Sequence, residues 1–93
     1  MIGITPRARR ALKKLLSSEL DHPLAALRLV TTDAGDYGLS IDIESKGDQV
    51  IEYGGSKVLL VGEKLSNELD GLTFDIEDTP SGSNLVIYKE RES

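Results

Sequence analysis

Hydrophobic residues recur with two different periodicities along this chain. After Thr5-Pro6 they return every three or four positions as far as Leu20, the spacing of an amphipathic helix. Thr5 is the expected N-cap and Pro6 the first helical residue, where a missing N–H costs little. His22-Pro23 disfavours any continuation of the helix. The pattern predicts a helix that ends near Leu20 and places these residues on one face: Ala8, Ala11, Leu12, Leu15, Leu16 and Leu20.

The rest of the chain is dominated by short strand-like runs. Residues 39–44 alternate strictly between apolar and polar, so this strand is expected to bury one face and wet the other. Residues 72–77 alternate in the same way. The unbroken apolar run Val58-Leu59-Leu60-Val61 indicates a strand covered on both faces. Further strands are expected at residues 25–31, 49–53 and 84–88, turns at 46–48, 54–56 and 79–83, and a short helix at 63–69.

This order of elements predicts a mostly β, α+β fold: short antiparallel sheets with an N-terminal amphipathic helix and one short helix. The 93 residues are enough for one small domain and not two, so residues 1–93 are expected to form a single domain. No stretch approaches the length of a membrane span, and the N-terminus does not read as a signal peptide. We therefore expect a cytoplasmic protein with no membrane partner.

The net charge of −5 is unevenly distributed, because the first predicted helix is basic. Such a helix can bind nucleic acid, or it can simply present a solvated face. We favour the solvated face and expect no nucleic-acid partner, since the acidic remainder of the chain would repel phosphate. The basic residues of the helix are Arg7, Arg9, Arg10, Lys13 and Lys14.

The residue types that carry enzyme chemistry are scarce. The absence of cysteine excludes a disulfide, a thiolate metal site and a cysteine nucleophile. No nucleophile elbow, P-loop or dinucleotide fingerprint is present, and we interpret Gly54-Gly55-Ser56-Lys57 as a hairpin turn. The single histidine, His22, has no carboxylate near it in sequence except Asp21, so we interpret it as structural or exposed. These observations predict a protein that is not an enzyme and has no cofactor.

The glycine-rich segment from Asp33 to Gly38 lies between two predicted strands and is suited to presenting a side chain. With Asp33, Gly38 and Glu44 at positions one, six and twelve, its spacing partly matches a calcium loop. Positions three and five supply no carboxylate, and Asp36 also suits a tight turn. A turn is the favoured reading, with a hard metal ion or small anion as the alternative.

Tyr37 is the second residue that this segment presents. A tyrosine can anchor a partner because it brings a large contact area with little conformational entropy to lose. It can equally fold back on the core, and both readings stay open at this stage. Tyr37 and Asp36 are the candidate partner contacts.

Several segments, in order, resemble the HesB-like family, the A-type (IscA-type) carriers of iron–sulfur cluster assembly. Ile4-Thr5-Pro6-Arg7-Ala8 is similar to the family's helix start, and Leu27-Arg28-Leu29 to its first strand. The stretch from Val61 to Asp75, with Leu69-Asp70-Gly71 inside it, is similar to a second family segment. Gly35-Asp36-Tyr37-Gly38 falls where the family has Gly-Cys-Ser-Gly.

The resemblance fails at the cluster ligands. The family's first cysteine corresponds to Asp36, and its Cys-Gly-Cys pair corresponds to a tail that here reads Lys89-Glu90-Arg91-Glu92-Ser93. Iron–sulfur clusters are held by cysteine thiolates, with histidine an occasional substitute. The resemblance therefore implies the fold and a tendency to form homo-oligomers, but not cluster binding. We expect a non-enzymatic domain that acts through a protein partner or a homo-oligomer.

Overall fold

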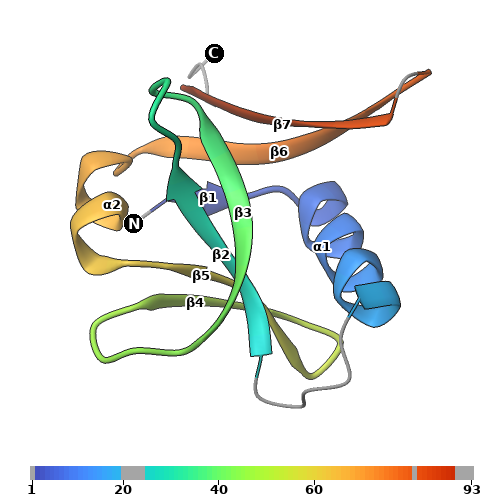
Figure 1. The fold of residues 1–93 in the computed structure, drawn as a ribbon, viewed down its shortest axis with the longest axis horizontal. Coiled ribbons are helices and arrows are strands. Elements are labelled where there is room, and N and C mark those ends of the chain that lie inside the picture. Colours follow the sequence, from blue (N-terminus) through green and yellow to red (C-terminus); the bar gives the residue numbers. More distant parts are fainter. Residues whose placement is uncertain (1, 20–24, 81, 90–93) are drawn as a thin grey trace.

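The computed structural model describes residues 2–19, 25–80 and 82–89 (Figure 1). Figure 1 shows the two helices on opposite sides of the molecule, with strands β2 to β5 between them. In chain order the elements are β1 (Gly3–Ile4), α1 (Pro6–Glu19), β2 (Ala25–Thr31), β3 (Tyr37–Ile43), β4 (Gln49–Tyr53), β5 (Ser56–Val61), α2 (Glu63–Glu68), β6 (Leu72–Thr79) and β7 (Gly82–Lys89).

The strands form two mixed sheets. One has the order β1-β6-β7 and the other the order β3-β2-β5-β4. The hairpin pairs β2–β3, β4–β5 and β6–β7 are antiparallel, as the short turns between them predict. The structure adds two parallel pairs, β1–β6 and β2–β5, which join strands that are distant in sequence. The predicted α+β class with an N-terminal helix and one short helix is confirmed, and its sheets are mixed rather than wholly antiparallel.

Helix α1 begins as its sequence predicts. The Thr5 hydroxyl accepts a hydrogen bond from the Ala8 N–H at 3.1 Å, which makes Thr5 the N-cap. The apolar stripe lies against both sheets, with its main contacts on β4, β5, β6 and β2. Ala8 and Leu12 are fully buried and Leu16 nearly so, whereas Leu15 is 40% exposed at the edge of the stripe. Leu20, Asp21, His22 and Pro23 lie outside the described residues.

Strand β5 is the centre of the core. All four residues of the run from Val58 to Val61 have no exposed surface, as the unbroken apolar pattern predicts. Phe74 from β6 and Leu29 from β2 complete the same core, so one cluster of apolar side chains joins the two sheets and α1. Neither helix among the described residues is long and apolar enough to cross a membrane.

The prediction that residues 39–44 bury their apolar face is wrong for most of that strand. Leu39 is partly buried against the core, but Ile41 is 52% and Ile43 55% exposed. The physical reason is position, because β3 is the outermost strand of its sheet and the main contacts of α1 lie on other strands. The alternation correctly predicts a strand, and it does not predict what covers it.

Candidate functional site

The glycine-rich loop is closed by one residue, Thr32. The Thr32 N–H donates to the carbonyl of Asp36 at 2.8 Å, and the Thr32 carbonyl accepts from the Gly35 N–H at 2.9 Å. The Thr32 hydroxyl accepts from the Asp36 N–H at 3.2 Å. Gly35 has φ of +84°, a conformation that side chains rarely adopt. The loop is thus shorter than the segment predicted from Asp33 to Gly38, because β3 already begins at Tyr37.

Both candidate contact residues lie at the surface. Asp36 is exposed at the end of the loop, and its backbone rather than its side chain makes the bonds that close the turn. Tyr37 is 36% exposed and pairs with Thr31 at the start of β3. The Tyr37 side chain is therefore not part of the buried core cluster.

The loop does not gather the carboxylates that a cation site needs. Asp42 lies six positions after Asp36 along extended strand, which corresponds to about 20 Å of chain. Among residues 2–19, 25–80 and 82–89, no three His, Asp or Glu side chains are placed to share a metal ion. Residues 32–38 themselves contain no Lys, Arg or His to attract a small anion. The calcium-like spacing is therefore not realised in space.

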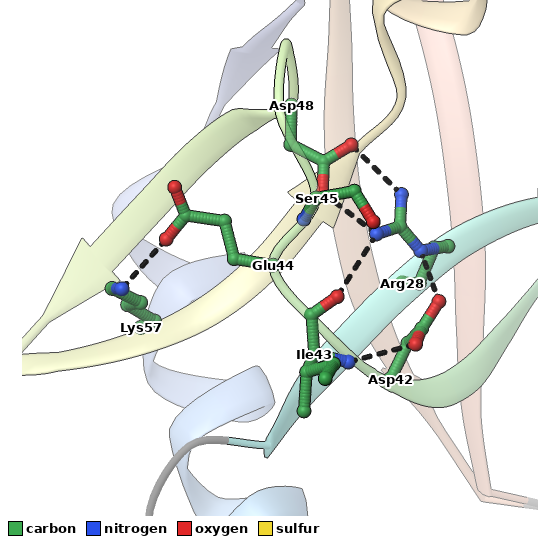
Figure 2. Close-up of polar contacts among 7 residues, drawn as sticks. All are labelled: Arg28, Asp42, Ile43, Glu44, Ser45, Asp48 and Lys57. Carbon is green, nitrogen blue, oxygen red and sulfur yellow. Dashed lines mark hydrogen bonds and ion pairs between the residues drawn. The ribbon is translucent and has the colours of Figure 1, made fainter.

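The most developed polar cluster centres on Arg28 in β2 (Figure 2). Its guanidinium donates to both carboxylate oxygens of Asp48, at 3.0 and 2.7 Å, and to Asp42 at 2.7 Å. A fourth bond, at 3.3 Å, reaches the carbonyl of Ile43. The side chains of Arg28 and Asp48 are only 16% and 4% exposed, against 47% for Asp42. The cluster holds the turn after β3 against the face of the sheet.

The electrostatics of this cluster favour its charged form. The hydrogen bonds from Arg28 lower the pKa of Asp48, with a further contribution from the Ser45 N–H at 2.7 Å. The pKa of Asp42 is lowered first by the Ile43 N–H and then by Arg28. Asp48 raises the pKa of Arg28. Because the guanidinium already faces two carboxylates and a carbonyl, it is occupied as a structural clamp and is not available to bind an anionic ligand.

A second ion pair holds Glu44, the residue at position twelve of the calcium-like spacing. Lys57 in β5 donates to Glu44 at 2.6 Å, and this contact raises the lysine pKa (Figure 2). Both side chains are more than two-fifths exposed, so the pair adds little to stability. Asp42 and Glu44 are thus each bonded to a cation of the chain itself.

Asp75 in β6 is a buried acid that the sequence does not single out. It is 4% exposed and accepts bonds from the Thr5 hydroxyl at 2.6 Å, the Ile76 N–H at 2.8 Å and two nitrogens of Arg7. These donors, Arg7 first, lower the pKa of Asp75 to about 2 against the cost of burial. The carboxylate thereby fixes the start of α1 to the sheet that contains β6.

The basic face of α1 is partly used inside the molecule. Besides Arg7, Lys13 donates to the hydroxyl of Ser56 at 2.5 Å, and Arg9 to the carbonyl of Glu52 at 3.4 Å. These contacts join the helix to the β4–β5 hairpin. The hairpin itself turns at Gly54 and Gly55, which have φ of +59° and +79°, the backbone of a two-residue turn and not of a phosphate loop.

Two small mixed sheets packed on an N-terminal helix, with one short helix before the last hairpin, define a class of α+β domain that can be compared with known proteins. No protein-family model and no curated protein matches this sequence. Solved structures do match. The structure of Escherichia coli SufA, described as involved in biosynthesis of iron–sulfur clusters, aligns with a TM-score of 0.73 at 22% identity, over 95% of this chain and 84% of that chain.

A second solved structure, IscA with a 2Fe–2S cluster, aligns with a TM-score of 0.63 at 16% identity, over 96% of this chain and 85% of that chain. This chain therefore has the SufA/IscA fold. The resemblance inferred from the sequence is confirmed at the level of fold, in a chain with no cysteine.

Neither polar cluster, the one around Arg28 or the one around Asp75, is predicted by the sequence. Arg28 and Asp75 were noticed only as parts of segments similar to the family. For Arg28 the usable signal is an isolated charge in an apolar strand, since a buried charge must be paired. Asp75 gives no such signal, because Glu77 and Asp78 belong to the same strand. The partner of each is distant in sequence, and no spacing rule identifies it.

Proposed function

We propose that this chain is a non-enzymatic interaction domain that has the SufA/IscA fold but holds no iron–sulfur cluster of its own. The observation that carries the proposal is the absence of cysteine from all 93 residues of a chain with this fold. Clusters need several thiolate ligands, and one histidine does not replace them. A cytoplasmic location remains a prediction from the sequence.

The loop supports the same proposal. Where the resemblance expects a cysteine, the chain has Asp36, whose oxygens are hard ligands poorly suited to cluster iron. The loop backbone is nevertheless closed by Thr32 and Gly35 into a defined turn. A well-formed turn without its reactive sulfur is suited to contact rather than to chemistry. We assign Asp36 and Tyr37 to the contact surface for a protein partner or a second copy.

The test is anaerobic reconstitution with ferrous iron and sulfide, followed by desalting in the presence of a chelator. We expect the wild-type chain to retain neither iron nor visible cluster absorbance, while SufA treated identically serves as the positive control. Stoichiometric iron and sulfide on the wild-type chain would overturn the proposal. The absorbance spectrum and the metal analysis report independently, so loosely adsorbed iron is recognised by its lack of sulfide.

A further inference from the structure

The side of α1 that faces away from the core carries only positive charge. Residues 1–18 contain no Asp or Glu, so the helix has no acid in its first turn. With 3.6 residues per turn, four cations project from one side of the helix over an arc of about 140°. We call these four side chains the cation patch: Arg9, Arg10, Lys13 and Lys14. Arg10 and Lys14 are exposed, and the other two are half-buried.

No carboxylate of the described residues neutralises the cation patch. Two of its members donate only to uncharged oxygens, Arg9 to the Glu52 carbonyl and Lys13 to the Ser56 hydroxyl. The other two make no hydrogen bond or ion pair with any described residue. All four positive charges therefore remain available to a partner outside the chain.

This arrangement lowers the stability of the helix. Like charges three or four residues apart repel one another, and the cation patch contains three such pairs: Arg9–Lys13, Arg10–Lys13 and Arg10–Lys14. The helix also lacks an acid in its first turn and a base in its last turn, which its dipole favours. Solubility does not require such a face, because a face of mixed sign is equally well solvated.

Helix α2 shows the usual arrangement within the same chain. It has Glu63 in its first turn, as the helix dipole favours. Lys64 and Glu68 lie four residues apart with opposite signs, and all three side chains are exposed. One helix of the chain thus follows the electrostatic preferences of helices and the other departs from them. The departure in α1 points to a requirement for an anion at that surface.

We propose that the cation patch binds an acidic segment of another protein, whose carboxylates form the ion pairs that this chain does not supply. Complementary charge of this kind favours both encounter and choice of partner. The inference goes beyond the proposed function, because it concerns a second surface and gives the chemistry of its partner. Figure 1 shows α1 apart from the loop between β2 and β3, which carries Asp36.

Other anionic partners fit the cation patch less well. A helix that lies on a membrane inserts its apolar face, but Leu12 and Leu16 are buried against the sheets. The patch extends over residues 9–14, about 8 Å of helix, and so meets few phosphates of a nucleic acid. A second copy of the chain carries the same net charge of −5, which repels it at long range.

The test is fluorescence anisotropy of a labelled Glu-rich peptide titrated with the full chain at about 0.15 M salt, where exposed charges are screened beyond about 8 Å. The wild type should bind this peptide, and added salt should weaken the binding. It should not bind the same peptide with Gln in place of every Glu. Arg10→Glu should weaken binding about fivefold or more, because it replaces an attraction with a repulsion.

Lys64→Glu is the matched control, because it makes the same change of charge at an exposed position of the other helix. It should change the affinity by less than about twofold. The melting temperature of Arg10→Glu should rise by about 3–6 °C, since Glu at position 10 forms favourable pairs with Lys13 and Lys14. A variant that is more stable and binds less well has not lost binding through unfolding.

Several results would overturn the inference. The first is a wild type that does not bind the Glu-rich peptide, or that binds the Gln peptide equally well. The second is an equal loss of affinity in Lys64→Glu. Tighter binding of a single-stranded oligonucleotide or of phosphatidylserine vesicles, lost in Arg10→Glu, would replace the protein partner. Self-association seen by sedimentation velocity and lost in Arg10→Glu would replace it with a second copy. None of these results bears on iron retention, so failure here and failure of the proposed function are distinguishable.

Discussion

Two six-residue segments of this chain are almost the same in sequence and opposite in environment. Residues 39–44 read Leu-Ser-Ile-Asp-Ile-Glu, and residues 72–77 read Leu-Thr-Phe-Asp-Ile-Glu. In β6, Phe74 and Ile76 are 0% and 3% exposed, whereas Ile41 and Ile43 in β3 are more than half exposed. The difference is set by place in the sheet, because β6 lies between two strands and packs on α1, and β3 is an edge.

The aspartates of the two segments repeat the contrast in polar terms. Asp75 and Asp42 each accept the N–H of the following isoleucine at 2.8 Å, and each is bonded to an arginine. The Asp75 side chain is 6% exposed and Asp42 47%. The same local motif therefore holds the start of α1 to β6 at a buried site, and in β3 it bonds Arg28 at the surface.

The largest expected difference in the free energy of unfolding is between alanine substitutions at Phe74 and at Ile41. Phe74→Ala should reduce the free energy of unfolding by about 3–5 kcal/mol, because it leaves a cavity in a closed core. Ile41→Ala, at the equivalent position of β3, should change it by no more than about 0.5 kcal/mol in dilute solution. Urea denaturation measures both. Equal losses would show that β3 is as well covered as β6.

The next largest expected difference in the free energy of unfolding is between asparagine substitutions at Asp75 and at Asp42. Asp75→Asn should cost about 2 kcal/mol at neutral pH, because it removes the charge that binds Arg7 at a buried site. Asp42→Asn should cost much less, since solvent replaces its contacts. Urea denaturation of the two variants beside the wild type measures this difference.

The pH dependence of the Asp75 effect follows from its lowered pKa. The pKa is about 2 in the folded chain and about 3.9 in an unfolded one. The stabilisation is therefore present above about pH 4 and is lost as the pH falls toward 2. The gap between wild type and Asp75→Asn should close over that interval, and a gap independent of pH would contradict the assignment.

The smallest expected effect comes from making the two segments identical. Ser40→Thr combined with Ile41→Phe gives residues 39–44 the sequence of residues 72–77. The free energy of unfolding should change by no more than about 0.5 kcal/mol in dilute solution, because both positions are exposed. Urea denaturation is again the measurement. A loss above about 1 kcal/mol would mean that β3 packs more tightly than its exposure indicates.

The sequence predicts the elements well because most of them are specified locally. Thr5-Pro6 starts α1, the glycines at 54 and 55 turn the hairpin, and the run from Val58 to Val61 forms the buried strand. The two-residue strand β1 was missed, since Gly3 and Ile4 have no pattern of their own and are defined by pairing with Thr73 and Phe74.

The candidate site was less predictable for the same physical reason. The closure of the loop by Thr32 is local, and the turn reading of Asp36 agrees with it. Asp36 is far from Asp42 and Glu44 because an extended strand lies between them. The calcium-like spacing along the sequence therefore does not bring these carboxylates together in space. The exposure of Ile41 depends on whether α1 or another element covers the face of β3, and alternation carries no information about that.

The parallel pairing of β1 with β6 has a consequence for how the chain is made. Thr5 bonds to Asp75, seventy residues further along the chain, and Ile4 pairs with Phe74 at a similar separation. At a synthesis rate of about 5–20 residues per second, the N-terminal segment waits several seconds for these partners. The apolar stripe of α1 lacks part of its cover during that interval, and contacts of such long range also slow folding. The pairing of β1 with β6, and the Thr5–Asp75 bond beside it, can therefore form only after β6 has been synthesised.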